Sequence, residues 1–487
     1  MKPRSIAFRA PPRVMAPLLA ALLIAGCSSD ERKAADEAAS AQAALDSGQI
    51  GVARQYIQRA LALRDDVSDY WLLMAHIALA GKDIGGAFSA YQNALQFDRA
   101  NVEALTSLCQ IALGANIAPQ AVKYADQLAL VIPASTLPNT VRAAAAAQRG
   151  DKARANQYLA LVFAARPGDV GGLLVKAHML ADESDFAGAA KVVEQSLAVP
   201  GDPTSRLFAL VEYYRLARDR DGLFSATERL ARVMPDDPDI QLHYADLLFD
   251  KGAIDAANAA ITRAARAAPN NIGIAAAALN LWLKQGRDAV PADRLAAAAA
   301  DTPLALRAAY AQFASETDRP ALAIRLLADA NLAAGQLTRP EVANAAAALA
   351  YARGMSGDRA AADAGLAAVL AADPNNPWAL LARGRLRAAA GDGRGALEDL
   401  RRAVAQDGAN VAARQTLADV LFRSGEPLLA ETALRDGMKA ADDDPRLAAT
   451  LARLQIAQGR RDKAAVTIAE FVRAHPLSRR AALLRAD

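Results

Sequence analysis

Few side chains in this chain of 487 residues have the types and spacing that chemistry requires. Histidine is a common metal ligand and general base, yet no histidine here stands in a His-Glu-x-x-His motif or beside a second ligand at metal-binding spacing. The histidines are His76, His178, His243 and His475. We therefore expect no metal site and no cofactor.

Two glycine-rich stretches, Gly81–Gly86 and Gly391–Gly395, could cradle a phosphate group with their backbone N–H groups. Both lack the lysine followed by serine or threonine that completes a phosphate-binding loop, and the second falls on an expected inter-helix turn. Acidic runs at Asp236–Asp237 and Asp442–Asp444 come just before expected helices, where carboxylates cap free N–H groups. We expect no enzyme activity and no small-molecule substrate.

The elements that must position these side chains form a repeat. A small residue recurs every 34 positions, with one irregular stretch between its eighth and ninth occurrences. The recurring residues are Ala53, Ala87, Ala121, Ala155, Ala189, Leu223, Ala257, Pro291, Ala362, Ala396, Ala430 and Ala464. Such a period indicates a solenoid, in which each unit is one helix pair that must stack on its neighbours to bury its apolar face.

Two further positions repeat when the recurring small residue is counted as the twentieth of its unit. The eighth position is also small, and a proline near the thirty-second stops the second helix because it lacks an N–H group and clashes with the preceding turn. The eighth positions hold Ala41, Ala75, Cys109, Ala143, Ala177, Ala245, Ala350, Gly384, Ala418 and Ala452, with Val211 and Leu279 as departures. The prolines are Pro133, Pro167, Pro235, Pro269, Pro303, Pro374 and Pro476.

This pattern, with Trp71 at the tryptophan position, resembles the tetratricopeptide repeat over about residues 34–478. The resemblance implies an all-α, right-handed superhelical solenoid of about 13 helix pairs that binds protein partners. One unit, about residues 306–342, is irregular. We expect its inter-helix turn at Thr317–Pro320 and a lengthened helix or loop around Leu332–Arg339.

Residues 1–26 have the features of a targeting segment and are left out of the fold. A basic region precedes the apolar residues 14–25, which are too few for a conventional membrane-spanning helix. Residues 24–27, Ile-Ala-Gly-Cys, resemble the lipobox of bacterial lipoproteins, in which the cysteine thiol receives a diacylglycerol group. The alternative is an ordinary secretory signal in which Cys27 is incidental.

The lipoprotein resemblance implies a location as well as an anchor. Acyl chains on Cys27 would hold the mature protein at a membrane, because two or more chains exceed the marginal binding of one. In that family, aspartate directly after the cysteine favours the inner membrane; here Ser28 follows, which implies the outer membrane, with the solenoid facing the periplasm. Residues 27–33 would form a short linker and residues 479–487 a C-terminal tail or capping segment.

The other cysteine, Cys109, has no second thiol to pair with if Cys27 is lipidated, so no internal disulfide is expected. Because it stands at an eighth repeat position, we expect a small buried residue; the alternative is a reactive or metal-binding thiol. Lys and Arg number 56 against 53 Asp and Glu, and this balance excludes the basic footprint of a nucleic-acid-binding protein.

Candidate partner-binding residues stand at the ninth position of the first helix of each unit, which in the family resembled points into the concave groove. We call them the ninth-position row: His76, Gln110, Ala144, His178, Glu212, Asp246, Asn280, Tyr351, Arg385, Asp419 and Arg453. All but Ala144 can form hydrogen bonds. The simpler interpretation is a solvated polar face; the more specific one is a groove for a partner's extended peptide or helix, with the arginines binding carboxylates.

These observations together predict a membrane-anchored periplasmic scaffold that binds protein partners. Repeat lipoproteins of this kind are similar to exosortase-associated and exopolysaccharide-export families, which implies a role in envelope assembly or in export of exopolysaccharide or surface proteins. Two alternatives stay open: a pilus or outer-membrane-protein assembly factor, and a regulator of a cell-wall synthase.

The lipobox interpretation makes a direct prediction. Cys27→Ser should block lipidation and processing of the signal segment, because the thiol is the acceptor of the lipid. The precursor should then accumulate, as measured by gel mobility and by flotation with membranes. A variant of normal mature size that still floats with membranes would contradict the lipid anchor.

Overall fold

The computed structural model describes residues 16–296, 302–441 and 444–484. Within these ranges every regular element is helical, which confirms the all-α prediction. The side chains of residues 1–29, including that of Cys27, lie outside the described part, so the lipobox stays a prediction. None of the described helices is both long enough and apolar enough to span a membrane.

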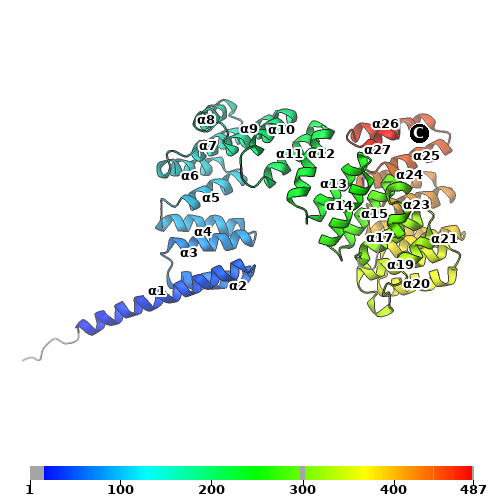
Figure 1. Cartoon of the computed structure of the whole chain (residues 1–487), viewed down its shortest axis with the longest axis horizontal. Coiled ribbons are helices and arrows are strands. Elements are labelled where there is room, and N and C mark those ends of the chain that lie inside the picture. Colours follow the sequence, from blue (N-terminus) through cyan, green and yellow to red (C-terminus); the bar gives the residue numbers. More distant parts are fainter. Residues whose placement is uncertain (1–15, 297–301, 442–443, 485–487) are drawn as a thin grey trace, which may run out of the picture. The chain divides into compact units, whose positions relative to one another are not determined.

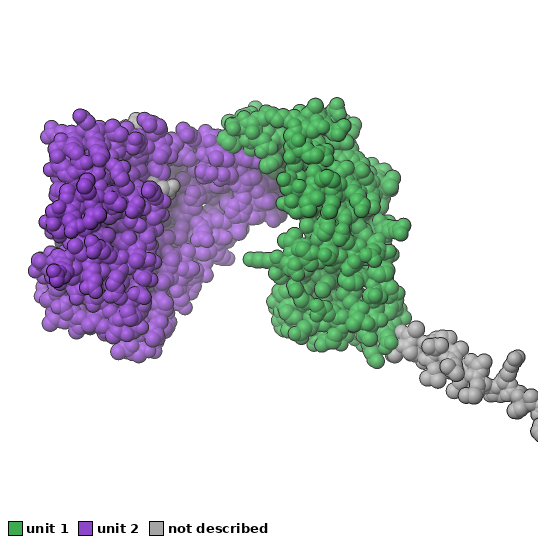
Figure 2. Space-filling view, turned by 180° about the vertical axis from the view of Figure 1, so that it is seen from behind, with its two compact units in different colours: residues 1–201 green, residues 202–487 purple. Residues whose placement is uncertain are grey.

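The helices form successive pairs that fall into two compact units, residues 1–201 and 202–487 (Figure 1, Figure 2). The described pairs of the first unit are α1 (Ala16–Asp46) with α2 (Ile50–Leu63), α3 (Ser68–Ala80) with α4 (Ile84–Phe97), α5 (Val102–Gly114) with α6 (Ala118–Val131), α7 (Leu137–Gln148) with α8 (Lys152–Ala165), and α9 (Val170–Asp182) with α10 (Phe186–Leu197). The helix α1 therefore includes the residues predicted as a linker.

The second unit continues the same alternation. Its described pairs are α11 (Thr204–Ala217) with α12 (Arg220–Val233), α13 (Pro238–Asp250) with α14 (Ile254–Ala267), α15 (Ile272–Gln285) with α16 (Ala292–Ala296), α17 (Leu304–Glu316) with α18 (Pro320–Leu326), α19 (Pro340–Met355) with α20 (Arg359–Ala372), α21 (Pro377–Ala389) with α22 (Gly393–Gln406), α23 (Val411–Arg423) with α24 (Pro427–Ala440), and α25 (Pro445–Ala457) with α26 (Arg461–Ala474). A short helix, α27 (Arg479–Leu483), and two 3-10 turns, η1 (Arg287–Ala289) and η2 (Ala334–Gln336), complete the unit.

Aspartate and asparagine side chains begin many of these helices. Asp392 accepts a hydrogen bond from Gly395 N at 2.9 Å, so the Gly391–Gly395 stretch covers the expected inter-helix turn and the first residues of α22. Asp237 and Asp444 cap α13 and α25 in the same way, which confirms that these members of the two acidic runs act as caps. A side-chain acceptor at this position satisfies one of the N–H groups that a helix leaves free at its start.

The turn between the two helices of a regular pair contains one residue with a left-handed backbone. At Gly391 the φ angle is +85°, and a Cβ there would meet no neighbouring atom. Non-glycine residues such as Arg218, with φ of +58°, stand at the equivalent position in other pairs. The requirement is therefore conformational, and glycine meets it without the steric cost that other L-residues carry.

The small residues predicted at the helix crossings are buried. Ala87, Cys109 and Ala121 are fully inaccessible to solvent, and the Cys109 thiol points to Ala121 O at 3.7 Å. Burial raises the pKa of Cys109 to about 12, so its reactive thiolate is scarce at neutral pH. The prediction of a structural cysteine is confirmed by its burial.

The regular repeat changes between α15 and α19. Helix α16 has five described residues, and α18 ends at Leu326, so residues 327–339 connect to α19 through turns and η2. The turn expected at Thr317–Pro320 lies between α17 and α18, and the extra residues form a loop rather than a longer helix. Every residue of α17 from Ala305 to Ser315 is buried.

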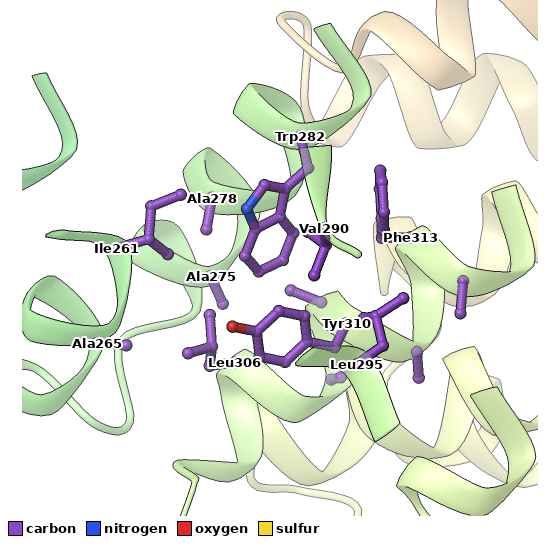
Figure 3. Close-up of a cluster of buried hydrophobic side chains, with 14 of the residues drawn as sticks. Ile261, Ala265, Ala275, Ala278, Trp282, Val290, Leu295, Leu306, Tyr310 and Phe313 are labelled. Atoms are coloured by element: carbon purple, nitrogen blue, oxygen red, sulfur yellow. The ribbon is translucent and has the colours of Figure 1, made fainter. Parts of the chain in front are cut away.

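A cluster around Trp282 packs the irregular region (Figure 3). The Trp282 ring stacks on Tyr310, with centroids 4.5 Å apart, and lies 5.9 Å from the Phe313 ring. Its indole N–H donates to Asn258 Oδ1 at 3.0 Å, and the Asn258 amide donates to Ala289 O at 2.8 Å. The aromatic rings thus supply much of the packing in this region, and the hydrogen bonds satisfy the buried indole and amide groups.

Cys109 offers a test of the helix crossing. Cys109→Ala should change stability little, whereas Cys109→Phe should overpack the crossing with α6 and cost about 1–3 kcal/mol, measured by urea unfolding. In a Cys27→Ser background the folded protein should not react with a thiol reagent at pH 8, and the unfolded protein should react once. Rapid labelling of the folded protein, or a Phe variant as stable as the parent, would show that this site is not buried.

Candidate partner-binding surface

The ninth-position row follows the buried eighth position by one residue. One residue of α-helix turns the side chain by about 100°, away from the crossing between the two helices of a pair. In the first unit this brings Gln110 and His178 to solvent, while His76 and Ala144 are half-buried, with 41% of the His76 side chain still accessible. This unit therefore presents one polar, accessible side chain on three of its first helices.

The two histidines of this row contact carboxylates. His76 Nε2 contacts the Glu103 carboxylate of the next helix pair. His178 Nε2 lies 3.9 Å from Asp182 Oδ1, one helical turn further along α9. Both pairs are exposed, so they contribute little to stability and leave the side chains available to another molecule.

In the second unit, Glu212, Asp419 and Arg453 are also exposed. Arg215 donates to both Glu212 carboxylate oxygens, at 2.8 and 2.6 Å, and this hydrogen bonding holds the pKa of Glu212 below its usual value. Arg423 Nε donates to Asp419 Oδ1 at 3.2 Å. These residues match the expectation of a solvated polar row.

Arg453 also borders an apolar hollow at the last helix pair. The hollow has a volume of about 810 Å³ and is lined by Ile456, Ile468 and Leu484 among others. At this end of the row, a polar group therefore stands beside apolar surface.

Tyr351 and Arg385 correct the expectation that the whole row faces solvent. Tyr351 is 8% exposed, and its ring lies 5.8 Å from the Arg385 guanidinium carbon. Arg385 pairs with Glu316, at the end of α17, and donates to Thr416 Oγ1 at 3.0 Å. The two residues are covered because α17 packs along α19 in this irregular part of the solenoid. Burial raises the pKa of Tyr351.

Asp246 belongs to a charged group that lines a cavity of about 470 Å³. Lys284 Nζ lies 3.2 Å from Asp246 Oδ2, and the Lys284 side chain is 9% exposed. Burial, and then the neighbouring Asp246, raise the pKa of Asp250. Desolvation by the surrounding protein lowers the pKa of His243, although the residue as a whole is exposed. The cavity thus holds groups of both signs on adjacent helices.

Asn280, the remaining member of the row, is exposed. Its Oδ1 accepts a long hydrogen bond of 3.5 Å from Arg446, which binds Asp444 more closely, at 2.9 Å. Residues far apart in sequence therefore meet here, because the second unit brings α15 and α25 together.

Sequence reasoning missed Asp250, Lys284 and Glu316. Asp250 and Lys284 follow Asp246 and Asn280 by one helical turn on the same helix face, so an i, i+4 search from the row would have found them. Glu316 had no such signal, because its contact with Arg385 depends on how the irregular pair packs. Within the described ranges, no group of three or more His, Cys, Asp or Glu side chains is placed to hold a metal ion.

Comparison with known proteins supports the repeat. Residues 387–450 match the tetratricopeptide repeat family. The match begins near the end of α21, covers α22, α23 and α24, and ends in α25, helices that alternate in the same way as the other regular pairs. No curated protein matches the sequence.

Several solved structures are similar in fold. PilF of Pseudomonas aeruginosa has a TM-score of 0.32 and is 16% identical, over 42% of this chain and 94% of PilF. Yeast Tom70 has a TM-score of 0.35 and is 12% identical, over 92% of each chain. The Cut9–Hcn1 hetero-tetramer structure has a TM-score of 0.28 and 14% identity, over 86% of this chain and 95% of the other. Each TM-score lies below 0.5, so these likenesses carry no functional meaning for this chain.

The Glu316–Arg385 ion pair predicts that two arginines of the ninth-position row contribute unequally to stability. Arg385→Ala should lower the free energy of unfolding by about 1–4 kcal/mol, because the largely buried Glu316 carboxylate loses its charged partner and keeps the hydrogen bond from Gln312. Arg453→Ala, an exposed arginine at the same repeat position, should stay within about ±0.5 kcal/mol. Urea unfolding followed by circular dichroism measures both. Equal midpoints for the two variants would mean that the Glu316–Arg385 pair contributes nothing.

Proposed function

We propose that this chain is a lipid-anchored periplasmic scaffold that binds protein partners along the ninth-position row and has no catalytic activity. The observation that supports this most is the repetition of one exposed polar side chain at the same position of successive helix pairs. In the first unit these are His76, Gln110 and His178. No packing requirement of the pairs explains polar groups there, since each pair is already closed by its small crossing residues.

The spacing of the row suits a polypeptide ligand. Packed helices lie about 8–10 Å apart, and an extended chain advances about 3.3 Å per residue, so a bound peptide would meet a new helix about every three residues. Exposed imidazole, carboxamide and carboxylate groups offer both donors and acceptors to a peptide backbone. A small molecule would contact only one or two members of such a row.

The anchor and the pathway are proposed on the sequence resemblance. A lipid on Cys27 would precede α2 by about six helical turns and hold the repeats near a membrane surface. A tethered scaffold of this kind fits a role in envelope assembly or in export of exopolysaccharide or surface proteins. In this proposal the ninth-position row would supply the binding surface for that role.

The proposal predicts which substitutions abolish partner capture. Alanine at His76, Gln110 and His178 together should reduce the partner recovered from solubilised membranes at least tenfold, while each exposed change alters stability by only about ±0.5 kcal/mol. Capture by the tagged full chain is measured by mass spectrometry, and melting confirms folding.

Matched alanine changes at Gln58, Gln127 and Lys191 serve as the control, since these residues are exposed on the second helices α2, α6 and α10 of the same unit. The control variant should capture the partner like the parent. If the control set abolishes capture and the row set does not, the second helices carry the binding surface; if neither set matters, the row is not the site.

A further inference from the structure

The C-terminal segment, residues 475–484, turns back onto helices that begin the second unit (Figure 1). Its helix α27 is held on the last pair: Ala481 is fully buried against Ala448 and Phe471, and Ser478 caps α27 by accepting from Ala481 N at 3.1 Å. This packing aims the arginines at the start of α27 toward α13 and α15.

Two consecutive arginines bind the ends of two successive first helices. Arg479 Nη1 donates to Asp250 O at 3.0 Å, and Asp250 is the last residue of α13. Arg480 Nη2 donates to Gln285 O at 2.6 Å, and its Nε donates to Gln285 Oε1 at 2.9 Å; Gln285 is the last residue of α15. The last carbonyl groups of a helix have no partner within the helix and carry partial negative charge, so they favour a cation.

The hydrogen bonds of the turn after α13 leave the Asp250 carbonyl group available to accept from Arg479. Lys251 N, Ala253 N and Gly252 N donate to the carbonyl groups of Leu247, Leu248 and Phe249, respectively. The Asp250 carbonyl group is the next one along the helix, and it receives Arg479. Because α13 and α15 pack side by side, their C-terminal ends lie close enough for two neighbouring arginines to reach both, although Gln285 stands one position later in its repeat than Asp250.

A third contact holds the segment from the other side. Arg220 Nη2, at the start of α12, donates to Pro476 O at 2.6 Å. The segment then forms one wall of the cavity that His243, Asp246 and Lys284 line from α13 and α15. Residues 474–478 therefore cover part of the ninth-position row in the second unit.

We propose that the C-terminal ends of α13 and α15 form a binding site for paired arginines, and that Arg479 and Arg480 occupy it as an intramolecular ligand. The segment is then a latch that closes the second unit and limits access to Asp246 and its neighbours. This inference rests on the proposed function only in that the latch would control a partner-binding surface. A segment tethered in the same chain competes at an effective concentration in the millimolar range, so an added peptide meets an occupied site.

The test uses the full chain and a fluorescein-labelled peptide of residues 474–484, with binding followed by anisotropy. Arg479→Ala with Arg480→Ala should free the site while leaving α13 and α15 intact, so this variant should bind the peptide with a Kd at least tenfold lower than the unaltered chain. A peptide with alanine at both arginines should not bind. The control is Arg473→Ala, an exposed arginine at the end of α26, which should behave like the unaltered chain.

Hydrogen exchange supplies a second measurement that does not depend on peptide affinity. Amides of residues 477–484 should exchange at least tenfold faster in the double variant and in Arg220→Ala, and at the unaltered rate in Arg473→Ala. Equal exchange in all four chains, or equal peptide binding by the double variant and the unaltered chain, would overturn the latch. A double variant that binds the peptide yet captures no partner would leave the latch standing and remove the scaffold function.

Discussion

Close approach of the two helices in each pair is the constraint on which the rest of this structure depends. At the crossing in the pair α21–α22 the residue is Gly384, where a Cβ would lie 2.8 Å from the Leu400 side chain. In most of the other regular pairs alanine or Cys109 fills the equivalent position and is buried, whereas the departures Val211 and Leu279 are half-buried. With thin helices in close contact, many small apolar contacts replace a large aromatic core, and each pair must stack on the next to bury what remains.

Stacking of the helix pairs determines which groups of the solenoid remain accessible for binding other molecules. Because the pairs repeat, any group that packing leaves free is repeated at one edge or face. The exposed side chains at His76, Gln110 and His178 are one example, and the helix-end carbonyl groups of Asp250 and Gln285 are another. A ligand with its own regular spacing, such as an extended peptide or two consecutive arginines, can therefore match several sites at once.

The irregular region shows what happens when the repeat is interrupted. Here Trp282 packs against Tyr310 and Phe313, and α17 is buried from Ala305 to Ser315. This shift places Glu316 against Arg385 and removes two members of the ninth-position row from solvent. One departure from a 34-residue period thus divides a continuous predicted surface into exposed and buried parts.

The sequence by itself determined the helix pairs, their turns and the buried crossing residues, because these depend on residues within one repeat. Alanine spacing, the Asp and Asn caps, and the prolines after the second helices each act over a few residues, and the pairing of α3 with α4 or α21 with α22 follows from them. The tertiary structure decided which ninth positions stay open. Whether Arg385 meets Glu316, or Arg480 reaches Gln285, depends on small rotations between pairs that accumulate along the solenoid, and no local sequence pattern encodes their sum.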